Sequence, residues 1–135
     1  MKYFSAVVLA LFIPVAALGA GTDTRNAADA AKSWLGLVDA SNYAQSWKSA
    51  SSLFQSHVTE AQWEAAAKAA RTPLGPIVAR KLVSTESAAT LPGAPDGHCV
   101  VLTFDTKFAH KAAAVETMAM ALDGGSWKTA GYHVR

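Results

Sequence analysis

The stretch VETMAMALDGGSWKTAGYHV, residues 115–134, carries the clearest fold signal in the sequence. Two apolar runs, 115–122 and 127–134, flank the turn sequence DGGS at 123–126. Glycine readily adopts the positive φ angles of tight hairpin turns, so this pattern predicts a β-hairpin. Gly131, inside the second run, predicts a bulge or a close approach of the backbone.

Two more strands are predicted before this hairpin. Residues 77–85 mix β-branched side chains with charges, and residues 98–108 follow the turn-forming sequence LPGAPDG at 91–97. Consecutive strands that are joined by short turns usually lie next to each other. The second half of the chain therefore predicts an antiparallel meander of about four strands.

Helical patterns fill the region before the strands. Residues 26–38 repeat apolar side chains at three- and four-residue spacing, which predicts a helix. Residues 39–42 interrupt the pattern, and a second helix is predicted to begin there.

A third helix is predicted from VTEAQW, where Thr59 and Gln62 have the spacing of a capping box. This helix is predicted to end near Arg71, because Pro73 disfavours helix at the residue before it. Helices first and a sheet second is the order of an α+β fold. Residues 21–135 suffice for one such domain and not for two.

The N-terminus has the pattern of a secretory signal peptide. Lys2 precedes an almost wholly apolar run at 4–18, and small residues follow. Cleavage is expected after Ala20 or after Gly19, which gives a periplasmic or secreted protein without stable membrane insertion. A membrane anchor is the alternative, but the run is shorter than the roughly 18–20 residues of a spanning helix.

Composition excludes several classes of protein. The 12 basic and 10 acidic residues nearly balance and are scattered, so nucleic acid is not expected as a partner. A single cysteine, Cys99, cannot form a disulfide within the chain.

Reactive groups are sparse. His98 and Cys99 are neighbours on a predicted strand and point to opposite faces, so the histidine is poorly placed to activate the thiol. A small buried residue is the simpler interpretation of Cys99, with a reactive thiol as the alternative. The four histidines lack the spacing of zinc ligands, and no serine lies in a Gly-x-Ser-x-Gly motif. We expect neither a metal nor a cofactor.

Five motifs together resemble the bacterial family called domain of unknown function 4019. They are WLGLVDASNYAQSW (34–47), RTPLG (71–75), LPGAPDG (91–97), ET (116–117) and AGYHVR (130–135). The resemblance implies an exported domain of the cystatin-like, nuclear-transport-factor-two-like type. In such folds a curved antiparallel sheet wraps against N-terminal helices and leaves a cone-shaped hollow. The resemblance brings no catalytic residues, because the family has no established activity.

Two charged residues fall at strand positions whose neighbours are apolar. Glu116 alternates with two methionines, and Arg80 alternates with Val78 and Leu82, although the opposite parity of that strand is also apolar. A buried charge must be paired, be neutralised or reach water in a cavity. We therefore expect Arg80 and Glu116 on one sheet face, either as a structural ion pair or as polar anchors of a ligand pocket.

Three aromatic residues are the remaining candidates for this pocket. Tyr132 alternates with Ala130 in the last strand and could direct its hydroxyl inward. Tyr43 and Trp47 lie on the second predicted helix, where core packing is the main interpretation and the wall of an apolar cavity the alternative.

Three functions remain open from the sequence. The first is a non-catalytic exported domain that binds a small ligand or a protein partner. The second is an isomerase- or dehydratase-like enzyme with Glu116 as general base and Arg80 or Tyr132 stabilising an oxyanion. The third is a structural module that forms a homodimer through its sheet face.

Overall fold

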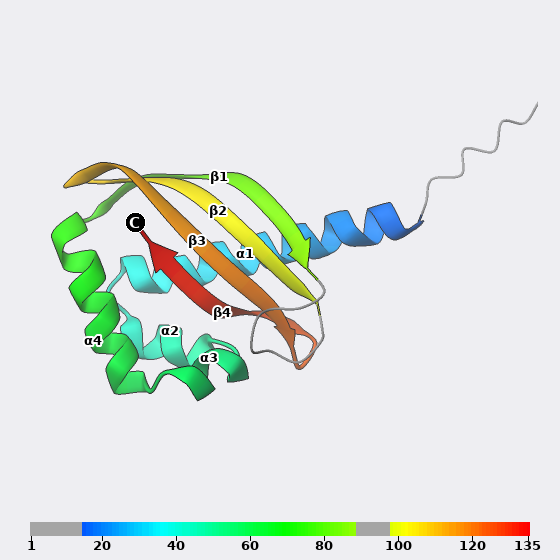
Figure 1. Cartoon of the computed structure of the whole chain (residues 1–135), viewed down its shortest axis with the longest axis horizontal. Helices are drawn as coiled ribbons and strands as arrows, with labels where there is room; N and C mark the ends of the chain where they lie inside the picture. Colours follow the sequence, from blue (N-terminus) through cyan, green and yellow to red (C-terminus); the bar gives the residue numbers. More distant parts are fainter. Residues whose placement is uncertain (1–14, 89–97) are drawn as a thin grey trace, which may run out of the picture.

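The computed structural model describes residues 15–88 and 98–135, with side chains from residue 23 onward. The predicted turn at 91–97 and most of the predicted signal peptide lie outside these ranges. Four helices precede four strands (Figure 1), which confirms the α+β class. The elements are α1 (Val15–Asp39), α2 (Tyr43–Ser49), α3 (Ser52–His57), α4 (Glu60–Arg71), the short 3₁₀ helix η1 (Thr72–Leu74), β1 (Ile77–Ala88), β2 (Cys99–Phe108), β3 (Lys111–Asp123) and β4 (Ser126–Val134).

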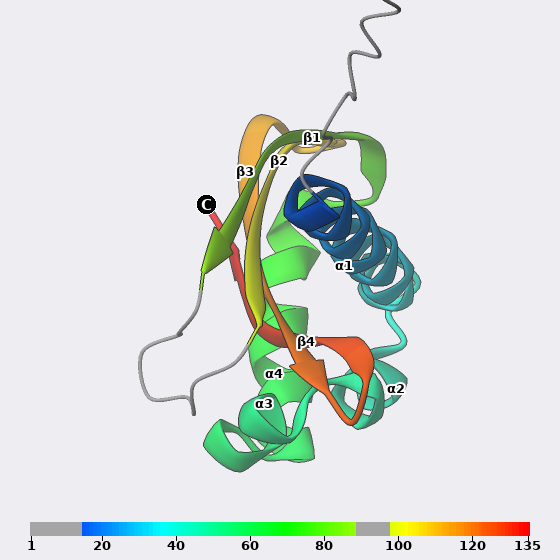
Figure 2. The ribbon, with the colours of Figure 1, turned by 90° about the vertical axis from the view of Figure 1, so that its right-hand side faces the viewer.

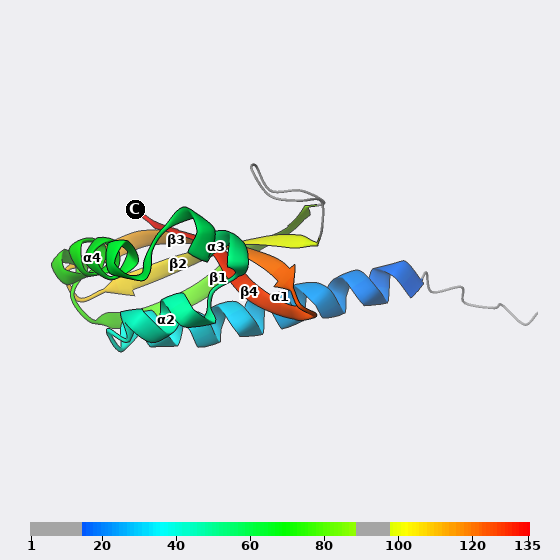
Figure 3. The same ribbon diagram turned by 90° about the horizontal axis from the view of Figure 1, so that it is seen from below.

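The four strands form one antiparallel sheet in the order β1-β2-β3-β4, as the meander pattern predicts. Figures 2 and 3 show a curved sheet with α1, α2, α3 and α4 gathered on one side of it. The other face of the sheet carries none of the helices described between residues 15 and 88 (Figure 2). The sheet therefore has an inner face against the helices and an outer face without that cover.

The hairpin between β3 and β4 forms at the predicted turn. Gly124 and Gly125 have φ angles of 60° and 82°, which suit glycine and explain its presence at both positions. Asp123 at the turn accepts hydrogen bonds from the backbone N–H and the hydroxyl of Ser52, at 2.8 and 2.9 Å. The turn is thus tied to the start of α3.

Two of the four register shifts in the sheet bear on the predicted positions. In β4, the pairing shifts between Ala119 and Met120 of β3, next to Gly131, where the sequence predicts an irregularity. In β1, a shift between Ile77 and Ala79 separates Val78 from the alternation of Arg80 and Leu82. Val78 is consequently 59% exposed, which corrects the expectation that it shares the inward face of Arg80.

The helix boundaries show one clear success and one correction. Thr59 and Gln62 form the predicted capping box, and α4 ends at Arg71 as expected. The helix expected at 26–38 is longer, because α1 begins at Val15 and ends at Asp39. Within the described ranges, no helix is both long and apolar enough to cross a membrane.

The core between helices and sheet is packed with aromatic side chains. Trp34 of α1 lies 5.6 Å from both Trp63 and Tyr132, measured between ring centroids. Phe54 contacts Trp63 edge-on at 5.1 Å. These rings fill the core around Tyr132, while a separate hollow of about 370 Å³ lies between α1 and the inner face of β3 and β4, with Trp34, Met120 and Thr129 among its lining residues.

Ser46 of α2 holds two of the tryptophans in place. Its carbonyl accepts from Trp34 Nε1 and its hydroxyl accepts from Trp63 Nε1, both at 2.8 Å. Ser46 is completely buried, so no water can replace its carbonyl as the partner of Trp34 or its hydroxyl as the partner of Trp63. These two hydrogen bonds thus fix the orientation of the Trp34 and Trp63 rings in the core.

We predict that Ser46→Ala lowers the free energy of unfolding by about 1–3 kcal/mol, because it leaves the Trp63 N–H buried without an acceptor. Ser49→Ala is the matched control, since Ser49 lies exposed on the same helix. Urea unfolding followed by tryptophan fluorescence measures both. Equal stability of the two variants would contradict the role given to Ser46.

Candidate functional site

The site is built around Glu116 of β3, whose side chain is completely buried. Arg80 Nε donates to Glu116 Oε1 at 2.7 Å, and Thr106 Oγ1 donates to the same oxygen at 2.6 Å. The Tyr132 hydroxyl donates to the other oxygen, Oε2. Since β1, β2 and β4 each supply one donor, the carboxylate is held from all three of the other strands of the sheet.

Arg80 of β1 links this carboxylate to the helical layer. Its Nη1 and Nη2 donate to Asp39 Oδ2 and Oδ1 at 2.8 and 2.9 Å, a bidentate pair with the last residue of α1. All three nitrogens of the guanidinium are therefore engaged. Such forked pairs combine charge attraction with fixed geometry.

Arg71, the last residue of α4, completes the group. Its Nη2 donates to Asp39 Oδ1 at 2.6 Å, and its guanidinium carbon lies 4.8 Å from the centroid of the Phe108 ring. Its other two nitrogens, Nε and Nη1, are buried without a hydrogen-bond partner. We call Asp39, Arg71, Arg80 and Glu116 the four-charge network; its two acids and two bases balance.

Burial and pairing act in opposite directions on the network. Burial raises the pKa of Asp39, but the hydrogen bonds and charges of Arg80 and Arg71 outweigh it, so this pKa lies below its ordinary value. Burial likewise works to lower the pKa of Arg80, and its pairing with Asp39 and Glu116 raises that pKa overall. Burial, together with the Glu116 charge and hydrogen bond, raises the pKa of Tyr132. The tyrosine hydroxyl therefore keeps its proton and acts as a donor.

The structure brings Arg80, Glu116 and Tyr132 together, as their strand positions suggested. Trp47 lies elsewhere, half-buried, with its indole Nε1 donating to the Val58 carbonyl at 2.8 Å. Tyr43 is also away from Glu116 and lines a hollow beside Asp39.

Sequence reasoning missed three members of the site: Asp39, Arg71 and Thr106. The first two end helices, where a polar residue is unremarkable, and the third is a threonine in a strand. The available signal was the inward strand parity of Thr106, which alternates with Phe104 and Phe108.

The hollow beside the network has a volume of about 210 Å³ and opens between the ends of α1 and α4. We call it the Arg71 hollow. Two charged side chains of the network line it, and its exposed polar lining residues are Ser41 and Thr72. Its lining residues are Val38, Asp39, Ser41, Tyr43, Arg71, Thr72, Gly75 and Pro76.

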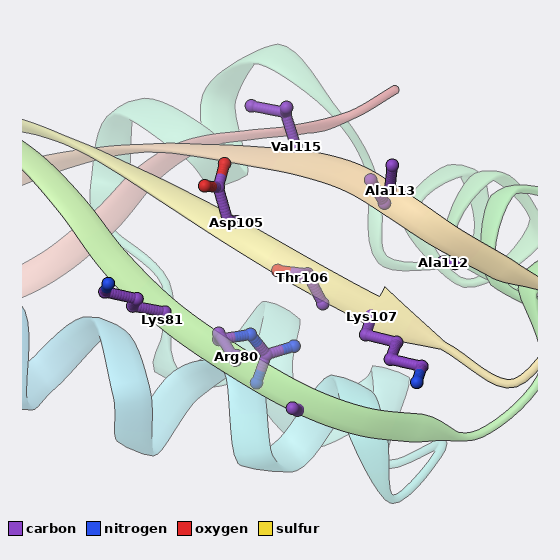
Figure 4. Close-up of a pocket in the computed structure, with 10 residues that line it drawn as sticks. Arg80, Lys81, Asp105, Thr106, Lys107, Ala112, Ala113 and Val115 are labelled. Carbon is purple, nitrogen blue, oxygen red and sulfur yellow. The ribbon is translucent and has the colours of Figure 1, made fainter.

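A larger hollow of about 390 Å³ lies over β1, β2 and β3. Figure 4 shows Asp105 and Val115 projecting to one side of the sheet and Arg80 to the other, toward α1. Its exposed lining residues are three alanines, Ala79, Ala112 and Ala113, and three charged residues, Lys81, Asp105 and Lys107. Polar side-chain atoms that are buried without a partner were found, among the described residues, only in Arg71, which does not line this hollow. The smaller hollow is therefore the better candidate site.

Other reactive groups do not assemble. Within residues 15–88 and 98–135, no three histidine, cysteine, aspartate or glutamate side chains gather in the arrangement of a metal site. Cys99 is buried on β2, and burial raises the pKa of its thiol.

Comparison with known proteins adds a family to this description. The model of the family described as "Protein of unknown function (DUF4019)" matches residues 30–132, so the chain belongs to that family. No curated protein and no solved structure matches the chain. The match extends from α1 to Tyr132 and includes the whole four-charge network.

We predict that Asp39→Asn lowers the free energy of unfolding at neutral pH by about 2 kcal/mol, because two guanidinium groups lose a charged acceptor. A folded-state pKa below the unfolded value of about 3.9 stabilises the protein above that pH and loses its effect as the pH falls through the folded-state pKa. The difference between the wild type and Asp39→Asn should therefore shrink below about pH 4.

Urea midpoints measured across this acid range test the expectation. Asp105→Asn is the control, because Asp105 is exposed and forms no ion pair with the described residues. Parallel stability curves for the wild type and Asp39→Asn would show that pairing does not lower the pKa of the Asp39 carboxyl.

Proposed function

We propose that this chain is an exported, non-catalytic binding domain that takes a small polar ligand into the Arg71 hollow. The observation that carries the proposal is the state of Glu116. The one carboxylate that the sequence places deep in the sheet is fully buried, and both its oxygens already accept hydrogen bonds.

This arrangement disfavours the enzyme that the sequence left open. A general base must come within hydrogen-bond reach of the proton that it removes. Glu116 is enclosed by its three donors, and Arg80 has no guanidinium nitrogen left for an oxyanion. The Tyr132 hydroxyl already donates its proton to Glu116, so it is not free to stabilise an oxyanion. The network supports a structural role, with binding at its edge.

The Arg71 hollow has features of a small-molecule site. Such sites are concave and combine apolar walls with a few polar groups that orient the ligand. Val38 and Pro76 supply apolar surface, while Asp39, Arg71 and Tyr43 supply charges and a hydroxyl. Asp39 is held by its bidentate pair with Arg80, so this carboxylate is in place before a ligand arrives.

The proposed export rests on the N-terminal sequence pattern. Cleavage after Ala20 would remove the first part of α1 and leave the helix from Gly21 to Asp39. Among the α1 residues whose side chains are described, 23–39, the buried ones begin at Ala27, and cleavage after Ala20 would retain all of them.

A second candidate function is binding of a protein partner or a second copy through the outer face of the sheet. The described helices leave this face uncovered (Figure 2). Val115, Thr117 and Ala119 form an uncharged, half-buried row along β3 on that side. A macromolecular partner would bury this row, whereas a small ligand in the Arg71 hollow would not touch it.

We predict that native mass spectrometry of the protein purified from its own host shows a monomer with one small molecule bound. The polypeptide should begin at Gly21 or Ala20. Mild activation should release the ligand, and denaturing spectra of the same sample should give the mass of the processed chain alone. A dimer without a ligand would favour the second candidate, and a bare monomer from freshly lysed cells would contradict both.

A further inference from the structure

The ligand class can be inferred more closely, on the premise that the Arg71 hollow is the binding site. We propose that it binds a small zwitterion, an α-amino acid, with the ligand carboxylate on Arg71 and the ligand ammonium on Asp39. The side chain of the amino acid lies against the apolar part of the wall at Val38 and Pro76.

Arg71 supplies the carboxylate site because its hydrogen bonding is incomplete. The residue is 7% exposed, yet only Nη2 has a partner, while Nε and Nη1 have none. Buried donors nearly always find an acceptor, so the unpaired nitrogens of Arg71 leave room for one. A carboxylate can accept two parallel hydrogen bonds from one of these nitrogens and from the second hydrogen of Nη2, because each two-donor edge of a guanidinium includes Nη2.

Asp39 supplies the ammonium site. Its Oδ1 accepts from both Arg71 and Arg80, but Oδ2 accepts only from Arg80, at 2.8 Å. Its side chain is 18% exposed, more than any other member of the four-charge network. α1 and α4 end at Asp39 and Arg71, and the partial negative charge of helix C-termini favours a cation in this place.

Charge balance selects a ligand that carries both signs. The four-charge network is neutral as it stands, so a simple anion would meet Asp39 and a simple cation would meet Arg71 at the same hollow. A zwitterion aligned against the Asp39–Arg71 pair satisfies both groups without adding net charge. Tyr43, Ser41 and Thr72 lie at the same hollow and offer hydroxyls to either end of the ligand.

One local movement is required. Nε and Nη1 of Arg71 are shielded from solvent, so the guanidinium must turn from the Phe108 ring toward the hollow when the ligand enters. Ser41, another lining residue, has a φ of 60°, a strained conformation for a residue other than glycine. Strain of this kind is often found where binding requires a fixed loop.

The test is a titration of the processed chain with three matched probes, monitored by two-dimensional NMR of the backbone amides. L-alanine carries both charges, propionate lacks the ammonium, and ethylamine lacks the carboxylate. L-alanine should shift amide signals of residues around the hollow and bind about tenfold or more tightly than either half-molecule, since each charge-assisted contact contributes that much. Equal affinity for L-alanine and propionate would replace the zwitterion by a simple anion and overturn the proposal.

Two variants locate the site. Thr72→Phe adds bulk at the mouth of the hollow and should weaken L-alanine binding about tenfold or more. Thr85→Phe makes the same change at an exposed position of β1 outside the hollow and should leave binding unchanged. Arg71→Gln should abolish the preference for L-alanine over ethylamine. Because Arg71 is buried, the amide spectrum of Arg71→Gln must first show that this variant keeps the wild-type fold. If it does not, Thr72→Phe alone tests whether L-alanine binds in the hollow.

The possible outcomes distinguish a failure of the amino-acid proposal from a failure of the proposed binding function. If native mass spectrometry finds a different small molecule and Thr72→Phe displaces it, the binding domain stands and the amino acid is wrong. If L-alanine shifts no signal around the hollow, the zwitterion site is refuted. If no ligand is found by either method, the small-ligand function fails as well.

Discussion

The forked pairing of Arg80 with Asp39, continued by its third nitrogen to Glu116, is the interaction on which this structure depends. One guanidinium joins the end of α1 to the middle of the sheet at distances of 2.7–2.9 Å. Charges this deeply buried are tolerated only when they are paired and hydrogen-bonded. The position of α1 against β1 and β3 therefore depends on the hydrogen bonds that Arg80 makes to Asp39 and Glu116.

Much of the fold could be predicted from the sequence, because its signals are local. DGGS determines the hairpin, Thr59 and Gln62 determine the start of α4, and strand alternation places Glu116 inside. Val78 was assigned to the wrong face because a register shift in β1 depends on pairing with β2, which no local pattern reveals. The family resemblance to DUF4019 was confirmed, while export remains a prediction.

The site could be predicted only in part, for a physical reason. Arg80 and Glu116 are conspicuous because each is a charge among apolar strand neighbours. Asp39 and Arg71 sit at helix ends, where polar residues are common, and only the packing of α1 against α4 brings them together. Aromatic rings pack around Tyr132, and the hollow beside Arg71 lies at the helix ends, where the sequence showed nothing unusual. Neutrality of the four-charge network then explains how it can be both buried and close to a polar hollow.

The central claim, that Glu116 is a structural partner of Arg80, is tested most directly by a double-mutant cycle. Urea unfolding would be measured for Arg80→Met, for Glu116→Leu and for the two combined. Each single change should lower the free energy of unfolding by about 3–5 kcal/mol, because it leaves a buried charge without its partner. The double variant should lose at least about 1 kcal/mol less than the sum of the two. Additive losses, within about 0.5 kcal/mol, would show that the two residues do not act as a pair.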